Sequence, residues 1–359
     1  MMQFPTIRSG LIVRTLSLLT LCLIASRALS ADRLMFEPVA PLANKHIVLI
    51  SGDEEYRTEE SMPMLGKILS QKHGFRCTVL FSLGPDGADY IDSNNSAGLR
   101  GLDSLDQADL MIIGTRFRNP DAAQGAYITK FLNAGKPVIG IRTATHAFKG
   151  KGSFGSIAYD DFGLKVLGET WVSHHGGHKV EGCRGVIESN QASHPILRGV
   201  RDLFVPTDVY GVKHLTDSDT VLMRAAVTKS LDPKSENVTG PKNESPQAFA
   251  WLHNYSKPDG NGMGRAFCTT GGGSVDFLNE GMRRLVVNAS FFLTDREVPA
   301  MADVNFVDPF HPSFYGFIQD TNYWKNANMK PDDFGLGKTP KMQDPPGTPT
   351  WRFDGSGNR

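Results

Sequence analysis

The sequence predicts an α/β fold in which a parallel sheet carries helices on both faces. Predicted strands and helices alternate four times within about a hundred residues of the first half, a pattern that implies crossovers between parallel strands. The apolar run at 138–141 also stops abruptly at the polar residues Arg142, Thr143 and Thr145. Such residues either form an ordinary loop or lie at the carboxyl edge of the sheet, where open α/β sheets bind ligands.

The N-terminus is typical of a secretory signal peptide spanning residues 1–30. Arg8 and Arg14 form a basic start, the apolar run at 16–25 is too short to span a bilayer, and Ala-Leu-Ser at 28–30 is a suitable cleavage site. A signal anchor is the competing interpretation. We therefore expect a secreted or periplasmic protein that has no membrane association after cleavage.

The charge balance bears on the class of partner. The chain has 38 Lys and Arg residues against 38 Asp and Glu residues, and no block of basic residues. This balance disfavours nucleic acid and anionic membranes as partners. Outside the signal peptide the cysteines are Cys77, Cys183 and Cys268, too few for a disulfide-stapled scaffold, although one disulfide remains open.

The first half is predicted to hold strands at 46–51, 76–81, 108–113 and 138–141. Helices at 59–73 and 121–134 show apolar residues at helical spacing, and each ends at a glycine. Right-handed crossovers bring the segments after the first, third and fourth strands to one edge of the sheet. The polar residues expected to converge there are Asp53, Glu54, Arg57, Arg116, Arg118, Arg142, Thr143 and His146.

The second half is less regular. Strands are expected at 184–188, 220–226, 249–255 and 265–270, followed by a last helix at 279–293. Residues 31–44 are expected to run extended over the surface. The α/β domain is predicted to span 45–295, and 296–359 to form an extended, partly disordered C-terminal tail, because this segment has no periodicity and is rich in Pro, Gly and Asn.

A histidine cluster at 174–178 is the densest set of metal ligands in the sequence. His174, His175 and His178 could bind a divalent metal such as zinc, with Asp208 or Glu169 adding a carboxylate. The two glycines within the cluster leave its geometry open. A polar sugar-binding loop and plain exposed histidines are the alternatives.

Arg142 occupies the strand-to-helix elbow where α/β enzymes often place a nucleophile. Arginine stays protonated and cannot be a nucleophile, but its planar fork can bind a carboxylate, a phosphate or a sugar hydroxyl. The alternative is an ion pair with an acidic residue of the loop at 52–55. No Ser or Cys has the Gly-x-Ser-x-Gly type of context, which disfavours covalent acyl chemistry.

Two further pieces could contribute to a site. Asp208 and Tyr210 could act as general base and hydroxyl donor, or else cap a turn and pack. Gly271 and Gly272 could present backbone N–H groups to an anion or oxygen, or else form a simple tight turn.

These pieces together resemble the ThuA-like family, named for trehalose utilisation and related to the class I glutamine amidotransferase fold. The resemblance covers about 46–293. It rests on Ser-Gly-Asp at 51–53, Gly-Ile-Arg-Thr-Ala at 140–144, Ser-His-Pro-Ile-Leu at 193–197, Thr-Asp-Val-Tyr at 207–210, and the closing segment at 264–272 before the helix with Val-Asn-Ala at 287–289.

The resemblance implies a flavodoxin-like sheet and a role in carbohydrate metabolism, by hydrolysis or isomerisation of a small glycoside or keto-glycoside. It implies no glutaminase activity, because Arg142 occupies the position of the amidotransferase cysteine. Relatives often carry His where this chain has Arg142, Gly-His where it has Gly271-Gly272, and an acid where it has Val209. A non-catalytic carbohydrate-binding protein that has lost the catalytic histidines is therefore the alternative.

The resulting hypothesis is a site for a small carbohydrate at one edge of the sheet. Asp53 and Glu54 are the acid–base candidates, with His146 and Asp208 assisting. The candidates for substrate binding are Arg116, Arg142, Thr143, Tyr210, Gly271 and Gly272. The sequence leaves self-association of the chain open.

Overall fold

The computed structural model describes residues 1–3 and 32–348, so most of the predicted signal peptide lies outside the described part. The strands are β1 (Arg33–Phe36), β2 (His46–Gly52), β3 (Arg76–Leu80), β4 (Leu110–Thr115), β5 (Val138–Ile141), β6 (Ser153–Phe154), β7 (Ile157–Ala158), β8 (Cys183–Ile187), β9 (Phe204–Val205), β10 (Thr220–Val227), β11 (Ala248–Ser256) and β12 (Met263–Thr269). The helices are α1 (Thr58–His73), α2 (Ala122–Asn133), α3 (Pro241–Glu244), α4 (Glu280–Leu293) and α5 (Tyr323–Ala327).

Short helical turns complete the secondary structure. They are η1 (Leu102–Gln107), η2 (Arg142–His146), η3 (Tyr159–Asp161), the π-turn η4 (Gly163–Leu167), η5 (Ser189–Gln191), η6 (Pro195–Leu197), η7 (Ser274–Leu278) and η8 (Pro331–Phe334). η2 directly follows β5 in the chain, and η7 follows β12 after the turn at 270–273, so both lie beyond the carboxyl end of a sheet strand.

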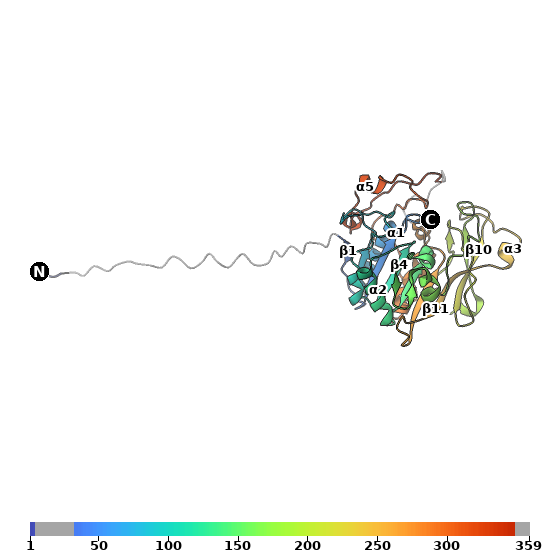
Figure 1. Cartoon of the computed structure of the whole chain (residues 1–359), viewed down its shortest axis with the longest axis horizontal. Coiled ribbons are helices and arrows are strands. Elements are labelled where there is room, and N and C mark those ends of the chain that lie inside the picture. The colour runs from blue at the N-terminus through green and yellow to red at the C-terminus, as the bar shows by residue number, and fades with distance from the viewer. Residues whose placement is uncertain (4–31, 349–359) are drawn as a thin grey trace. The chain divides into compact units, whose positions relative to one another are not determined.

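A ten-stranded sheet organises the chain in the order β1-β3-β2-β4-β5-β12-β11-β10-β8-β9. In Figure 1, β1, β4 and β10 of this sheet follow one another from left to right across the domain. The strands from β3 to β12 in this order run parallel, which confirms the predicted α/β fold. The other half of the sheet is antiparallel. The reason is the short connection at 257–262, which allows a hairpin between β11 and β12 but no helical crossover.

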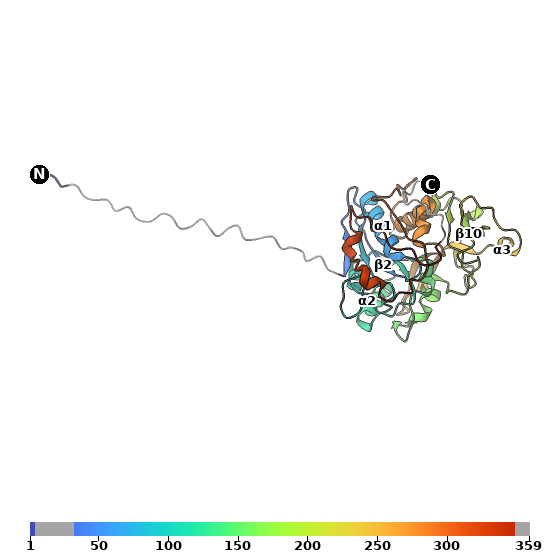
Figure 2. The same ribbon diagram turned by 90° about the horizontal axis from the view of Figure 1, so that it is seen from above.

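The layers follow from the buried faces of the parallel strands. On β2, Ile47 and Leu49 pack in the same core as α1 and α4, whereas Val48 and Ile50 pack in the core that contains α2. Figure 2 shows β2 between α1 and α2. Strands covered on both faces have continuous apolar runs instead of an alternating pattern.

Two terminal segments attach to this core. The leader, expected to run extended over the surface, instead forms β1, an edge strand whose Phe36 pairs with Cys77 of β3. At the other end, 296–348 contains α5 and η8, and Phe310, Trp324 and Phe334 from this segment pack in the same core as α1. Large aromatic side chains buried this way fix the C-terminal segment on the domain.

Cys77, Cys183 and Cys268, the cysteines within 32–348, are buried and free. They serve as small core residues, and no disulfide joins any two of these three cysteines. Across 1–3 and 32–348, no helix has both the length and the apolar character that crossing a bilayer requires.

Candidate functional site

The segments that follow β2 and β4 meet at the carboxyl edge of the sheet through ion pairs. Glu54, after β2, accepts hydrogen bonds from Arg116 and from Arg118, whose Nη2 lies 2.6 Å from Oε2. Arg118 is buried and also donates to the backbone oxygen of Ser93 at 2.8 Å. Two guanidinium groups therefore hold Glu54, which was expected as an acid–base residue, while burial raises the pKa of its carboxyl group.

Arg57 does not converge on this edge as expected. It begins α1 in the left-handed conformation at φ 62° and is fully buried. Its Nη2 donates to the backbone oxygen of Gly316 at 3.1 Å, and its guanidinium lies 5.6 Å from the centre of the Trp324 ring. Arg57 thus binds the C-terminal segment.

Asp53 shapes the loop after β2. Its Oδ1 accepts from the backbone N–H groups of Glu55 at 2.8 Å and Tyr56 at 2.9 Å, and its Oδ2 accepts from the hydroxyl of Thr143. Both Asp53 and Thr143 are fully buried. The pair that we expected to contact substrate therefore ties the β2 loop to η2, because buried carboxylates need such partners.

Arg142 likewise directs its donors inward. Its left-handed backbone, at φ 51°, sends the side chain into the protein, where the guanidinium lies 4.4 Å from the ring centre of Tyr56 and 3.8 Å from that of Tyr210. It donates to the backbone oxygen and to Oδ1 of Asp208, the latter at 3.2 Å, and to the backbone oxygen of Thr270 at 2.8 Å. With no exposed surface, it orients Asp208 instead of reaching a ligand, and its ion pair is with Asp208 instead of an acid of the 52–55 loop.

Asp208 is the centre of the cluster. Oδ2 lies 2.6 Å from Nδ1 of His174, and Oδ1 lies 3.2 Å from Nδ1 of His178. Burial alone would raise the pKa of Asp208, but Arg142 and the two imidazoles outweigh it and hold this pKa below its usual range. Asp208 is therefore a fixed carboxylate that orients both histidines.

The loop at 174–178 comes this close because of its glycines. A Cβ at Gly176 would lie 2.9 Å from the Cβ of Asp208, so a larger residue would push the loop away. The loop brings His174 and His178 together, with ring centres 4.7 Å apart. His175, grouped with them in the predicted metal site, points elsewhere, and its Nε2 lies 2.9 Å from the backbone oxygen of Lys242.

Glu55 is the residue that sequence reasoning missed. Its Oε1 lies 3.4 Å from Nε2 of His178, and its Oε2 lies 3.6 Å from Nε of Arg116. Burial and the nearby Asp53 raise the pKa of Glu55, although Arg116 and His178 oppose the shift. Its position in the acidic triplet 53–55 was visible, but nothing in the sequence distinguished it from its neighbours.

His146 lies among aromatic rings. Its ring centre is 5.0 Å from that of Phe117, 5.8 Å from that of Trp171 and 6.1 Å from that of Tyr210. Burial, reinforced by the charges of nearby arginines, lowers the pKa of His146 to about 3. The imidazole is therefore neutral at physiological pH and can accept a hydrogen bond from a ligand. Trp171, which the sequence did not single out, is 40% exposed.

The glycine turn after β12 does not present free donors. The N–H groups of Gly272 and Gly273 donate to Oδ2 of Asp276 at 2.8 and 2.9 Å, and that of Gly271 donates to Oγ1 of Thr269 at 3.2 Å. The expected oxyanion pocket of Gly271 and Gly272 is thus filled by the buried Asp276. The same carboxylate accepts from the hydroxyl of Thr207 at 2.6 Å and so fixes the loop that carries Asp208.

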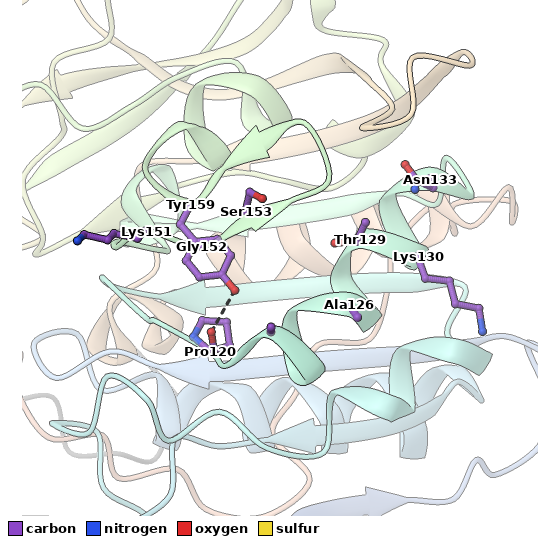
Figure 3. Close-up of a pocket in the computed structure, with 10 residues that line it drawn as sticks. Pro120, Ala126, Thr129, Lys130, Asn133, Lys151, Gly152, Ser153 and Tyr159 are labelled. Carbon is purple, nitrogen blue, oxygen red and sulfur yellow. Dashed lines mark hydrogen bonds between the residues drawn. The ribbon is translucent and has the colours of Figure 1, made fainter.

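A separate groove of about 670 Å³ lies between α2 and the β6–β7 hairpin (Figure 3). Its lining includes Thr129, Lys130, Lys151 and Tyr159, and the hydroxyl of Tyr159 donates to the backbone oxygen of Pro120 at 3.0 Å. None of the residues that the sequence predicted as functional lines this groove.

Comparison with known proteins gives a family match and several structural likenesses. The model of the ThuA family, described as trehalose utilisation, matches residues 47–293, more than half of the chain. A ThuA-like protein from Bacteroides uniformis is 13% identical, with 71% of this chain and 93% of that chain covered and a TM-score of 0.44. A ThuA-like protein from Parabacteroides merdae is also 13% identical, with 73% and 94% covered and a TM-score of 0.46.

A cytoplasmic protein from Salmonella typhimurium is 12% identical, with 69% of this chain and 98% of that chain covered and a TM-score of 0.41. No curated protein matches the chain. At these identities and scores, the likenesses to solved structures add no functional information.

Proposed function

The chain belongs to the ThuA family of trehalose utilisation, and on that premise we propose that it hydrolyses or isomerises a small glycoside or keto-glycoside. Family membership by itself gives a role in carbohydrate metabolism. The observation that supports the finer proposal is the connected series Glu55–His178–Asp208–His174, in which each neighbouring pair of side chains lies 2.6–3.4 Å apart. Such a series can hold and move protons at a partly exposed surface.

Roles in proton transfer follow from these contacts. Because Nδ1 of His174 donates to Asp208, its Nε2 is left as a base, and the side chain is 34% exposed. Glu55, beside His178, is the corresponding acid. Hydrolysis needs a base to activate water and an acid to protonate the leaving oxygen, and isomerisation of a keto-sugar needs a base at carbon and an acid at the carbonyl oxygen.

Export is part of this proposal. Residues 1–30 have the pattern of a signal peptide, and the proposed site of action is outside the cytoplasm. N-terminal sequencing of the protein recovered from a periplasmic or culture fraction tests this. A mature N-terminus near residue 31 would support export, and an intact N-terminus in the cytoplasm would contradict it.

A metal-assisted hydrolase is the second candidate function. One ligand atom each from His174, His178 and Asp208 lies within 4.8 Å of the others. Two imidazoles and a carboxylate suit Zn²⁺ or another divalent transition metal, which would supply a nucleophilic water. In that case the Nδ1 atoms that face Asp208 would direct lone pairs at the ion instead of protons at the carboxylate.

His175, whose side chain lies outside the group formed by His174, His178 and Asp208, gives a matched control for metal binding. Metal content of the purified protein would be measured for the wild type, His178→Ala and His175→Ala. A metal site predicts a stoichiometric ion that is lost in His178→Ala and kept in His175→Ala. Metal-free wild-type protein, after exposure to Zn²⁺ and desalting, would contradict this candidate.

Turnover is the deciding experiment for the leading proposal. The mature chain would be incubated with trehalose, other small glucosides and their keto forms, and products would be followed by NMR. We expect turnover that falls by about 100-fold or more in Glu55→Gln and Asp208→Asn and persists in His175→Ala. Equal rates in all variants would refute the assigned roles.

Sugar binding without turnover would instead support a non-catalytic carbohydrate-binding protein. Two features favour that alternative. Arg142 stands where relatives often carry a histidine and donates to Asp208, Thr270 and Tyr56. The N–H group of Gly272 donates to Asp276, and that of Gly271 to Thr269.

A further inference from the structure

Residues 313–317 belong to the C-terminal segment 296–348, which lies outside the family match at 47–293, yet they contact residues of the site. Ser313 donates its backbone N–H and its hydroxyl to the two carboxyl oxygens of Glu60, at 2.9 and 2.6 Å. The backbone N–H of Gly316 donates to the backbone oxygen of Glu55 at 2.7 Å. Because Glu55 also faces His178, this hydrogen bond joins the segment directly to the proposed proton-transfer series.

Tyr315 anchors the segment beneath the histidines. It is fully buried, stacks on Tyr56 with ring centres 5.3 Å apart, and donates its hydroxyl to the backbone oxygen of Pro206 at 3.2 Å. Its ring meets that of His178 edge-on at 5.5 Å. Such burial and hydrogen bonding fix the backbone of this segment, so the residues after Tyr315 are held in place.

Gly316 then turns the chain so that Phe317 faces outward. Gly316 has φ 148°, a conformation that favours glycine, and a Cβ there would lie 2.6 Å from Nζ of Lys179. Phe317 is 38% exposed, and the guanidinium of Arg116 lies 5.0 Å from the centre of its ring. Arg116 in turn contacts Glu55, so Phe317 borders the cluster.

The distribution of exposed aromatic side chains marks this place on the surface. Within 1–3 and 32–348, the large hydrophobic side chains that are exposed include one Trp, Trp171, and one Phe, Phe317. Trp171 contacts His146 and His174, and Phe317 contacts Arg116. Contact of two such apolar rings with water is unfavourable. Both rings border the polar cluster that contains His174, Glu55 and Arg116.

We propose that the C-terminal segment supplies Phe317 as an aromatic ring on which the carbohydrate stacks. Phe317 lies after the family match at 47–293, whereas Trp171 lies within it. Sugar rings have an apolar face of C–H groups that packs on aromatic rings, while their hydroxyls need polar partners such as Arg116 and Glu55. The ligand class is a neutral sugar with a pyranose ring. Phe317 is thus a specificity-determining residue outside the catalytic series, and this assignment rests on the proposed function.

The test is sugar binding by calorimetry, with trehalose, maltose, sucrose and glucose as probes. The variants are Phe317→Ala, Phe317→Tyr and the control Leu336→Ala, which changes an exposed apolar residue elsewhere in the C-terminal segment 296–348; Leu336 is 48% exposed. We expect Phe317→Ala to weaken binding of the accepted sugar about five- to tenfold, while Phe317→Tyr and Leu336→Ala stay within about twofold of the wild type. Where the sugar is turned over, KM should rise and kcat should stay near the wild-type value.

The outcomes separate this inference from the proposed function. Wild-type binding that Phe317→Ala leaves unchanged, with unaltered thermal stability, would overturn the inference and keep the function. Equal losses in Phe317→Ala and Leu336→Ala would overturn it as well, because a general effect of the segment would explain both. Failure of the wild type to bind any of the probes would count against the carbohydrate function itself, and the inference would fall with it.

Discussion

Replacing Glu60 by glutamine should stabilise the protein at alkaline pH. Glu60 is a buried residue in the first turn of α1, next to the buried Glu59, and it accepts both hydrogen bonds of Ser313. Burial, with the neighbouring charge of Glu59, raises its pKa from 4.5 to about 8. Glu59 can use Arg57, 3.6 Å away, as its partner, whereas Glu60 keeps its proton at neutral pH.

The size and sign of the effect follow from linkage. The pKa is higher in the folded state than the ordinary value expected on unfolding, so folding binds a proton. Its contribution to stability is complete below pH 4.5 and is lost as pH rises through 8. A shift from 4.5 to about 8 corresponds to about 5 kcal/mol of stability lost between these limits, an upper bound because water entering on ionisation would reduce it. The amide introduced by Glu60→Gln would imitate the protonated acid. Its oxygen would accept the Ser313 N–H, and its NH2 group would donate to the Ser313 hydroxyl oxygen, which in the ionised form donates instead.

Denaturant unfolding of the wild type and Glu60→Gln at pH 5, 7 and 9 measures this effect. The two proteins should be similar at pH 5, and the variant should be the more stable at pH 9 by up to about 5 kcal/mol. The control is Glu297→Gln, at an exposed position, which should keep the pH dependence of the wild type. Parallel stability curves for wild type and Glu60→Gln across this range would refute the reasoning, and so would a variant that is less stable at pH 9.

Three further predictions concern the site and its support. Asp208→Ala should lower the free energy of unfolding by about 3 kcal/mol or more, measured by denaturant titration, because it leaves a buried guanidinium unpaired; a loss below about 1 kcal/mol would contradict the buried ion pair. Gly272→Ala should destabilise the protein by more than about 2 kcal/mol beyond Gly260→Ala, because its Cβ would lie 1.9 Å from Cγ2 of Ile141, whereas Gly260 also has positive φ but open space. The imidazole NMR signals of His146 should not titrate between pH 5 and 8, since its pKa is about 3; a midpoint near 6.5 would show a solvated ring.

The sequence predicted the parallel strands and their helices because burial on both faces leaves local patterns. The run at 46–51 and the helical spacing at 59–73 correspond closely to β2 and α1. Long apolar runs and glycine stops depend on a residue's immediate neighbours, so they can be recognised without a structure. The antiparallel strands β8, β10 and β11 were also predicted in position, whereas the short strands β1 and β9 were not. The direction of these strands depends on how short connections fold back.

The candidate site was predicted less completely, because residue type does not tell which way a side chain points. Arg142 was expected to bind a ligand, but its left-handed backbone turns the side chain toward Asp208, 66 positions away in the sequence. Gly272 was expected to offer a donor, but Asp276 occupies it. Buried polar groups need partners, and these partners come from distant segments that no spacing rule connects.

The sequence by itself therefore determined the α/β class, the family resemblance and the edge of the sheet where polar residues gather. Tertiary structure decided which of these residues are structural and which are exposed. It separated His175 from His174 and His178, selected Glu55 from three adjacent acids, and brought Phe317 to a cluster formed by residues far earlier in the chain. The physical reason is that local periodicity encodes burial, whereas a site depends on contacts between segments whose proximity arises only when the sheet and its C-terminal segment pack together.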